Sequence, residues 1–246
     1  MQPEIPVCRL PATRPVNLAV VIPALNEATT VGAVVSQVLE HTAGWATRVV
    51  VVDNGSGDDT QRVAREAGAE VVPAAPRGYG IACLRAIEYL SDWPDVLLFL
   101  DADGSSRAAE IPSLLTPIHL RAADLVIGCR SDRSAMTLPQ YWGTRLAISL
   151  IHFRWGRRFQ DMGPFRAIRQ DSYRLLGMRD RTWGWTVEMQ ILAVLQGLNI
   201  LEVPVSWLPR QGGTSKISGT VSGVARAGAR ILWTIARYSF RSCLLL

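Results

Sequence analysis

The chain has 246 residues, of which 48% are hydrophobic and 19% are charged. These values exclude a disordered chain and favour one α/β domain with a sizeable core. Lys and Arg outnumber Asp and Glu by 26 to 21, giving a net charge of +5. That excess suits anionic partners such as nucleotides, lipid phosphates or a membrane surface, without choosing among them.

The cysteines and the N-terminus indicate the cellular compartment of the protein. Cys8, Cys83, Cys129 and Cys243 show neither a CxxC pair nor ligand spacing, so neither a zinc site nor a disulfide framework is predicted. Residues 1–16 have Pro and Arg where a signal peptide needs an apolar core, and no window offers about 18 uninterrupted apolar residues. We therefore expect a cytoplasmic protein, or one that is peripheral at the cytoplasmic face of a membrane.

Strands and helices are predicted to alternate along the first half of the chain. The expected strands are 17–22, 48–52, 70–72 and 96–100, and the expected helices are 30–40, 60–67 and 80–90. Unbroken runs of Val, Leu and Phe indicate strands that are buried on both faces, and the alternation indicates a parallel sheet with right-handed crossovers. Thr29 or Thr30 is expected to cap the first helix.

Three of these strands end in polar loops at the same predicted edge of the sheet. The loops contain Asn26-Glu27, Asp53 to Ser56, and Asp101 to Asp103. Each loop alone fits ordinary turn chemistry, but ligands of open α/β sheets bind at this edge, so the three together favour a binding site. Acids there can accept from a base N–H and from ribose hydroxyls, and a divalent ion on Asp103 can neutralise a diphosphate.

The ordered set of motifs carries a resemblance. The motifs are Val21-Ile22-Pro23-Ala24-Leu25-Asn26-Glu27, Val52-Asp53-Asn54-Gly55-Ser56, Arg77-Gly78-Tyr79-Gly80, Leu100-Asp101-Ala102-Asp103, Gly128-Cys129-Arg130, Asp161 to Arg166, Glu202 to Val205 and Arg210 to Lys216. This set resembles family 2 glycosyltransferases of GT-A fold, close to the dolichyl-phosphate mannose and glucose synthase branch. It implies a mostly parallel, Rossmann-like central sheet with helices on both faces, in a single domain over residues 1–246.

The resemblance implies a nucleotide-sugar half over residues 17–130. The residues expected to bind the donor are Pro23, Leu25, Asn26, Glu27, Asp53, Asn54, Gly55, Arg77, Gly78, Asp101, Ala102, Asp103, Arg210 and Lys216. Among these, Asp53 is expected near the base, Asp101 near the ribose, and Asp103 on a Mg²⁺ or Mn²⁺ ion that bridges the diphosphate. A hard cation there would stabilise the charge that develops on the departing nucleotide.

One donor motif departs from the family pattern. Many members have Asp-Asp-Gly-Ser where this chain has Asp53-Asn54-Gly55-Ser56. The Asn54 amide both donates and accepts hydrogen bonds, whereas a second Asp would only accept. UDP-sugars and GDP-sugars therefore both remain possible donors.

An acceptor half is implied over residues 131–218. A strand predicted over residues 124–127 precedes this half, and a second is predicted over residues 200–205. The predicted helices are 138–155 and 182–196. By resemblance, Arg130 meets phosphate, while Arg145 and Ser149, spaced i, i+4 on one helix face, contact a lipid phosphate. A surface arginine is the plain alternative for Arg130, and no tight motif fixes the register of Arg145 and Ser149.

Two acids of this half are candidates for catalysis, together with Asp103 and Arg130. Asp161 belongs to a loop expected over residues 160–169, where it would contact acceptor or sugar, or simply form a turn. Glu188, near the start of its helix, would be a general base for a hydroxyl acceptor, a sugar ligand or a first-turn acid. A phosphate acceptor is already an anion and needs no base.

Two basic segments complete the chain. Residues 208–216 form a Gly-rich loop that suits phosphate capture, and the resemblance implies that it closes over the diphosphate. Residues 219–246 form a predicted basic amphipathic helix. It has Arg226, Arg230, Arg237 and Arg241 near one face, and Val224, Ile231, Ile235 and Tyr238 roughly opposite. A membrane-surface helix and a core-packed helix with a solvated Arg face fit this pattern equally well.

These inferences combine into one leading hypothesis, a metal-dependent inverting glycosyltransferase that moves a hexose from a nucleotide-diphosphate sugar onto a polyprenyl phosphate. The alternatives are the same donor chemistry with a hydroxyl acceptor, on a glycan, glycerol derivative or lipid, and a nucleotide-sugar-binding protein without catalysis. A nucleic-acid partner is not expected.

Overall fold

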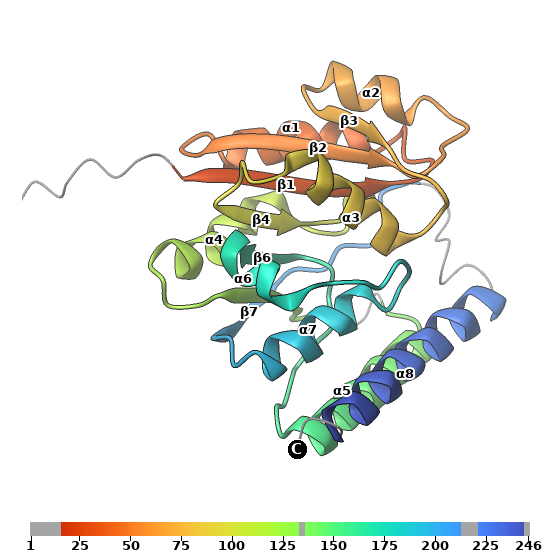
Figure 1. Cartoon of the computed structure of the whole chain (residues 1–246). Coiled ribbons are helices and arrows are strands. Elements are labelled where there is room, and N and C mark those ends of the chain that lie inside the picture. The colour runs from red at the N-terminus through yellow and green to blue at the C-terminus, as the bar shows by residue number, and fades with distance from the viewer. Residues whose placement is uncertain (1–15, 133–135, 213–220, 244–246) are drawn as a thin grey trace, which may run out of the picture.

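The structure is a computed structural model that describes residues 16–132, 136–212 and 221–243, and one sheet of seven strands runs through them (Figure 1). The strands are β1 (Asn17–Ala24), β2 (Ala46–Asp53), β3 (Glu70–Pro73), β4 (Val96–Phe99), β5 (Leu125–Arg130), β6 (Arg166–Arg169) and β7 (Ile200–Val205). Their spatial order is β3-β2-β1-β4-β6-β5-β7. The strand pairs are parallel except for the two that β6 makes with β4 and β5, so the predicted mostly parallel sheet is confirmed.

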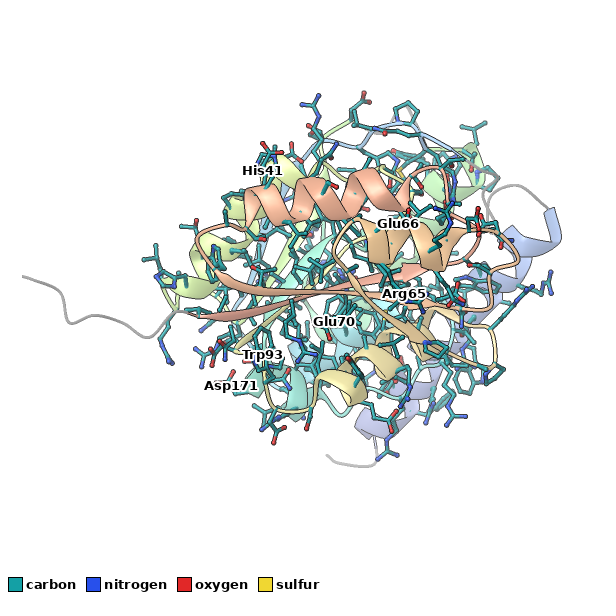
Figure 2. The ribbon with its side chains drawn as sticks, turned by 90° about the horizontal axis from the view of Figure 1, so that it is seen from above. His41, Arg65, Glu66, Glu70, Trp93 and Asp171 are labelled. Carbon is teal, nitrogen blue, oxygen red and sulfur yellow. The ribbon has the colours of Figure 1, made fainter. Side chains whose placement is uncertain are left out.

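Helices cover both faces of this sheet. They are α1 (Val31–His41), α2 (Thr60–Glu66), α3 (Tyr79–Leu90), α4 (Ile111–His119), α5 (Leu138–Trp155), α6 (Gln170–Leu176), α7 (Trp185–Leu195) and α8 (Val221–Cys243), with a short 3-10 turn at Ala108–Glu110. One core lies between the sheet and α1, α2 and α4, and the other lies between the sheet and α3, α5, α6, α7 and α8. Figure 2 shows the two layers from above, with His41 of α1 on one side of the strands and Trp93 and Asp171 on the other.

The two cores explain the unbroken apolar runs in the strands. In β4, Leu97 and Phe99 point into one core while Val96 and Leu98 point into the other. Successive side chains of a strand point to opposite faces of the sheet. Because helices cover both faces here, the side chains on both sides of such a strand are apolar. The element boundaries predicted for the first half are confirmed to within two residues.

Two predictions about local structure are wrong. The segment 160–169, expected as a loop, ends in β6, a four-residue strand that runs antiparallel between β4 and β5. Its short length and its arginines at both ends hide it from a search for apolar runs. Thr30 occupies the N-cap position of α1, but its hydroxyl donates to the carbonyl of Ala102 (2.8 Å) instead of capping the helix. That bond ties the start of α1 to the loop after β4.

The predicted C-terminal helix is observed as α8, and its apolar face packs against the protein. Ile235 and Tyr238 are buried in the core shared with α5 and α7. Arg154 of α5 donates to the carbonyl of Ser239 (3.1 Å), so the last turns of α5 and α8 meet. The core-packed alternative therefore describes this face. Across the described residues, each helix is too short or too polar to cross a membrane.

Candidate active site

The three acidic loops lie together, as the sequence predicts. Strand β1 pairs in parallel with β2 and with β4, and its end aligns Ala24 with Asp53. The loops after β1 and β2 are joined directly, since Ser56 Oγ accepts from Asn26 N (2.9 Å) and Asn26 Oδ1 accepts from Gly57 N (2.8 Å). We call the carboxylates at this end of the sheet the acidic edge, formed by Glu27, Asp53, Asp101 and Asp103.

Asp53 is held firmly at the end of β2. It is 2% exposed, and its carboxylate accepts from Gln61 Nε2 (2.8 Å) and from Ser56 N (3.2 Å). These bonds fix the orientation of a buried carboxylate beside the loops of β1 and β3. Pro23 and Leu25, two other predicted donor contacts, are half-buried at the end of β1.

Asn54 braces the loop that follows β3. Its Nδ2 donates to the carbonyls of Ala74 (3.1 Å) and Pro76 (3.4 Å), and its Oδ1 accepts from Gly78 N (2.6 Å). An ionised Asp could not make the two donations, so this brace depends on the Asn amide. The neighbouring Arg77 donates to the carbonyl of Gly55 (2.8 Å), so the predicted residues Asn54, Gly55, Arg77 and Gly78 form one connected unit.

Arg210 crosses the acidic edge from the loop after β7. Its guanidinium contacts the carboxylates of Glu27 and Asp103, the latter at 3.2 Å. Gln211 N also donates to the carbonyl of Asp103 (3.1 Å). The basic loop therefore contacts the acidic edge through Arg210 and Gln211, and its closure over a diphosphate stays a prediction. Lys216, the other basic residue predicted for the loop, lies outside the described residues.

Burial and a neighbouring acid raise the pKa of Asp101. Burial, followed by the neighbouring Asp103 carboxylate, raises the pKa of Asp101 to about 7. A carboxyl group with a raised pKa keeps its proton closer to neutral pH than an ordinary Asp, so it can donate as well as accept hydrogen bonds. Ala102, between the two acids, is buried and offers its carbonyl to Thr30.

The edge also fits a divalent cation. Glu27 and Asp103 already converge on one positive charge, the guanidinium of Arg210, and both offer hard oxygen ligands. In the described part of the chain, three or more His, Cys, Asp or Glu residues do not gather as a metal-binding group. A metal held by Asp103 would need further oxygen ligands, and Mg²⁺ in proteins commonly takes them from substrate phosphates.

Arg130 and Asp161, predicted separately, form one ion pair. Asp161 accepts from Arg130 Nε (2.6 Å), Nη2 (2.5 Å) and backbone N (3.0 Å). Burial alone would raise the pKa of Asp161, but the bonds and charge of Arg130 outweigh it and hold the pKa below its ordinary value. Within the described residues this two-pronged contact uses only part of the guanidinium, so its other N–H groups can donate to an anion.

Sequence reasoning assigned no role to two side chains beside this pair. Trp207 follows β7, and the Arg130 guanidinium lies 5.0 Å from the centre of its ring. Glu202 of β7 accepts from Gln160 N (2.8 Å) and lines a cavity of about 330 Å³ together with Arg130 and Ser131. The sequence signal for Trp207 was its position directly after a strand and next to a basic loop. Glu202 belongs to the motif Glu202 to Val205 that carries the resemblance, but that motif assigned it no role.

The other predicted acceptor residues lie apart from that pair. Arg145 and Ser149 are exposed on the outer side of α5, and in the described structure neither is bonded to Arg130. Their i, i+4 spacing does place them one turn apart on one face. Their assignment to a lipid phosphate stays a prediction.

Glu188 is enclosed by structural contacts. It is 1% exposed and accepts from the Tyr238 hydroxyl (2.6 Å) and from the backbone N–H groups of Arg179 (2.9 Å) and Asp180 (2.6 Å). Asp180 in turn pairs with Arg230 of α8 (2.8 Å). Glu188 therefore joins α7, α8 and the loop before α7, and its carboxylate is committed to that junction.

Arg166, the last residue of the motif Asp161 to Arg166, has a structural role as Glu188 does. It is fully buried in β6 and donates to the carbonyls of Gly163 and Thr186, the latter at 2.9 Å. Burial lowers the pKa of Arg166 to about 10. Its contacts connect the loop that carries Asp161 to the first turn of α7.

Solved structures with the same arrangement define the class of fold. Glucosyl-3-phosphoglycerate synthase from Mycobacterium tuberculosis, in complex with Mn²⁺, uridine diphosphate and glucosyl-3-phosphoglycerate, superposes with a TM-score of 0.72. The alignment covers 89% of this chain and 80% of that one at 21% identity. The fold is thus that of GT-A glycosyltransferases, as predicted.

The sequence comparisons give the family. Residues 19–182 match the Glycosyl transferase family 2 domain, and the chain belongs to that family of enzymes. It is 35% identical over 210 residues to an uncharacterized glycosyltransferase of Mycobacterium tuberculosis, covering 84% of this chain and 92% of that protein. It is 32% identical over 212 residues to the dolichyl-phosphate hexose transferase of Haloferax volcanii, covering 85% and 90% of the two chains.

Proposed function

We propose that this glycosyltransferase moves a hexose from a UDP- or GDP-sugar to a polyprenyl phosphate at a membrane surface, with a Mg²⁺ or Mn²⁺ ion bound at Asp103. The name of the Haloferax volcanii relative, a dolichyl-phosphate hexose transferase, supports the acceptor class. The Mn²⁺ and uridine diphosphate in the Mycobacterium tuberculosis structure support the donor class.

One observation favours a phosphate acceptor over a hydroxyl acceptor. Asp161 and Glu188, the two candidate bases, both have their carboxylates committed, to Arg130 in one case and to Tyr238 and two backbone N–H groups in the other. A hydroxyl acceptor must lose a proton as it attacks, and a base engaged in this way is poorly placed to take it. A phosphate brings its own negative oxygen.

The proposed reaction is a direct displacement. An acceptor phosphate oxygen forms a bond to the anomeric carbon while the bond from that carbon to the donor diphosphate breaks, and the configuration inverts. Asp53 and Asp101 would position the base and ribose, and Asp103 would hold the ion. Once bound, that ion would supply Lewis-acid stabilisation of the departing diphosphate.

Two arginines would bind the phosphate groups of the donor and the acceptor. Arg210 already lies at the acidic edge, where a diphosphate would give its guanidinium a second set of anionic partners. Arg130, oriented by Asp161, would direct its remaining N–H groups to the acceptor phosphate. Neither step requires the enzyme to provide a nucleophile.

A transfer assay tests the proposal. Radiolabelled UDP-hexoses and GDP-hexoses are each incubated with the protein, Mn²⁺ and polyprenyl phosphate, and the lipid fraction is counted. We expect label in the lipid with one donor, and none when polyprenol replaces polyprenyl phosphate. Transfer to the alcohol, or no transfer to lipid with any donor of the panel, would contradict the acceptor class.

A further inference from the structure

Large apolar side chains gather on the solvent side of α5. Trp142 is 66% exposed and Phe153 is 90% exposed, and Leu138 and Leu146 are exposed as well. Residues spaced by four, four and seven along a helix fall within about 80° of one another around its axis. The opposite side of α5 is buried through Ala147 and Ile151. This stripe is therefore a continuous outer face and not a scatter of single residues.

Helix α8 presents similar side chains beside it. Leu232, Trp233 and Phe240 are exposed, and Phe240 reaches 74%. The two helices lie together at the end of the molecule farthest from β3 and α2 (Figure 1). Of the twelve large hydrophobic side chains that are exposed in the described residues, seven are on α5 and α8. We call these seven residues the α5–α8 face.

The charged residues of these two helices have one sign, although one of them, Arg230, pairs with Asp180 of the loop before α7. The sequences of α5 and α8 contain no Asp or Glu, but they contain Arg145, Arg154, Arg226, Arg230, Arg237 and Arg241. Arg145 is exposed within the stripe of α5, and Arg226 is exposed on α8. The guanidinium groups of Arg230 and Arg237 lie 4.4 Å and 5.2 Å from the ring centre of Trp233. Aromatic and cationic groups are thus interleaved along the face.

We propose that the α5–α8 face docks on an anionic phospholipid bilayer. Trp, Phe and Leu side chains insert into the boundary between headgroups and acyl chains, while arginines at the same level bind lipid phosphates. A protein partner would need an apolar patch rimmed by matching acids, and a second copy of this acid-free face offers none. The bilayer satisfies both the apolar and the positive character of the surface.

This docking rests on residues other than those of the acidic edge. It adds to the proposed function the surface by which the enzyme reaches a lipid substrate, and it predicts that Arg145 and Ser149 lie at the headgroup level. Because the docking needs neither donor nor acceptor, it is tested apart from the transfer reaction.

Vesicle sedimentation tests it with the full chain. The protein is spun with vesicles of phosphatidylcholine alone, or of phosphatidylcholine with phosphatidylglycerol, in the absence of polyprenyl phosphate and nucleotide. We expect partitioning onto the anionic vesicles to be at least about tenfold stronger and to weaken as salt is raised. The double variant Trp142→Ser/Phe153→Ser should lower that partitioning by about tenfold or more, since it removes two inserted rings.

Matched controls separate this face from apolar exposure in general. Leu120 lies just after α4 and Leu175 lies on α6, and both side chains are exposed. The variants Leu120→Ser and Leu175→Ser should therefore bind vesicles like the parent. Equal binding by the double variant and the parent, or no binding to either vesicle, would overturn the proposal. So would a dimer in light scattering that Trp142→Ser/Phe153→Ser converts to a monomer, because the face would then be a subunit interface.

Discussion

At the acidic edge, each acid lies within a few residues of the strand that positions it, whereas the acceptor region is built from pairs far apart in the chain. Glu27, Asp101 and Asp103 follow parallel strands of one sheet, and Asp53 is the last residue of another. Arg130 and Asp161 are 31 residues apart, and Glu188 and Tyr238 are 50 apart. One region is assembled by sheet topology, and the other by side-chain bonds from β5 to the loop before β6 and from α7 to α8.

The difference predicts how each region responds to change. At the acidic edge the backbone already places the carboxylates, so removing one should abolish a ligand contact and leave the fold intact. In the acceptor region a carboxylate is itself part of the scaffold, so its removal should cost folding stability. The following substitutions separate these two outcomes.

The largest effect is expected for Asp103→Ala. Its carboxylate bonds Ser105 N and Arg210, so the fold should survive, while Mn²⁺-dependent binding of UDP or GDP should fall by about a hundredfold or more. Calorimetry with and without Mn²⁺ measures this. Asp92→Ala, a strongly exposed surface acid, is the matched control and should bind normally. Retention of metal-dependent binding by Asp103→Ala would show that the metal assignment is wrong.

Asp161→Asn should destabilise the protein by about 3 kcal/mol, because it leaves the buried side of Arg130 without its counter-charge. Since the pKa of Asp161 is held below its ordinary value of 3.8, the ion pair stabilises the fold fully above that value. The contribution is lost as the pH falls through the lower folded-state pKa. Urea unfolding at several pH values should therefore show the gap between parent and variant closing in acid.

An exposed ion pair provides the control for that experiment. Asp171 pairs with Arg169 but is 65% exposed, so Asp171→Asn should cost about 0.5 kcal/mol or less. If Asp161→Asn were equally mild, the Arg130 pair would not be part of the scaffold. The contrast drawn between the two regions would then fail.

The same contrast explains what could be predicted from sequence. The acidic edge was predictable because a buried strand and the polar residues at its end are adjacent in the chain, as Val96 to Leu100 and Asp101 show. Helical periodicity identified the apolar side of α8, but it could not say that the protein itself covers Ile235 and Tyr238. Likewise nothing local to Glu188 reveals that a hydroxyl from α8 reaches its carboxylate.

Asn54→Asp tests the brace on the loop after β3. A carboxylate oxygen would face the carbonyls of Ala74 and Pro76, so we expect a cost of about 2 kcal/mol and about tenfold weaker nucleotide binding. Asn17→Asp is the matched control, because it also removes an amide donation, to Trp93, at the opposite end of β1. It should lower stability and leave nucleotide affinity unchanged. Equal affinity losses in both variants would indicate a general loss of fold.

The smallest effect on turnover is expected for Glu188→Gln. The amide oxygen can keep the bonds from Arg179 N and Asp180 N, and its NH₂ group can donate to the Tyr238 hydroxyl, so turnover should fall by less than about tenfold. Tyr238→Phe removes the same hydroxyl contact without touching the carboxylate and should behave alike. A general base predicts a different result, a loss of about 10² to 10⁴ in turnover for Glu188→Gln alone. That outcome, with binding intact, would favour a hydroxyl acceptor over a phosphate, because only a hydroxyl needs its proton removed.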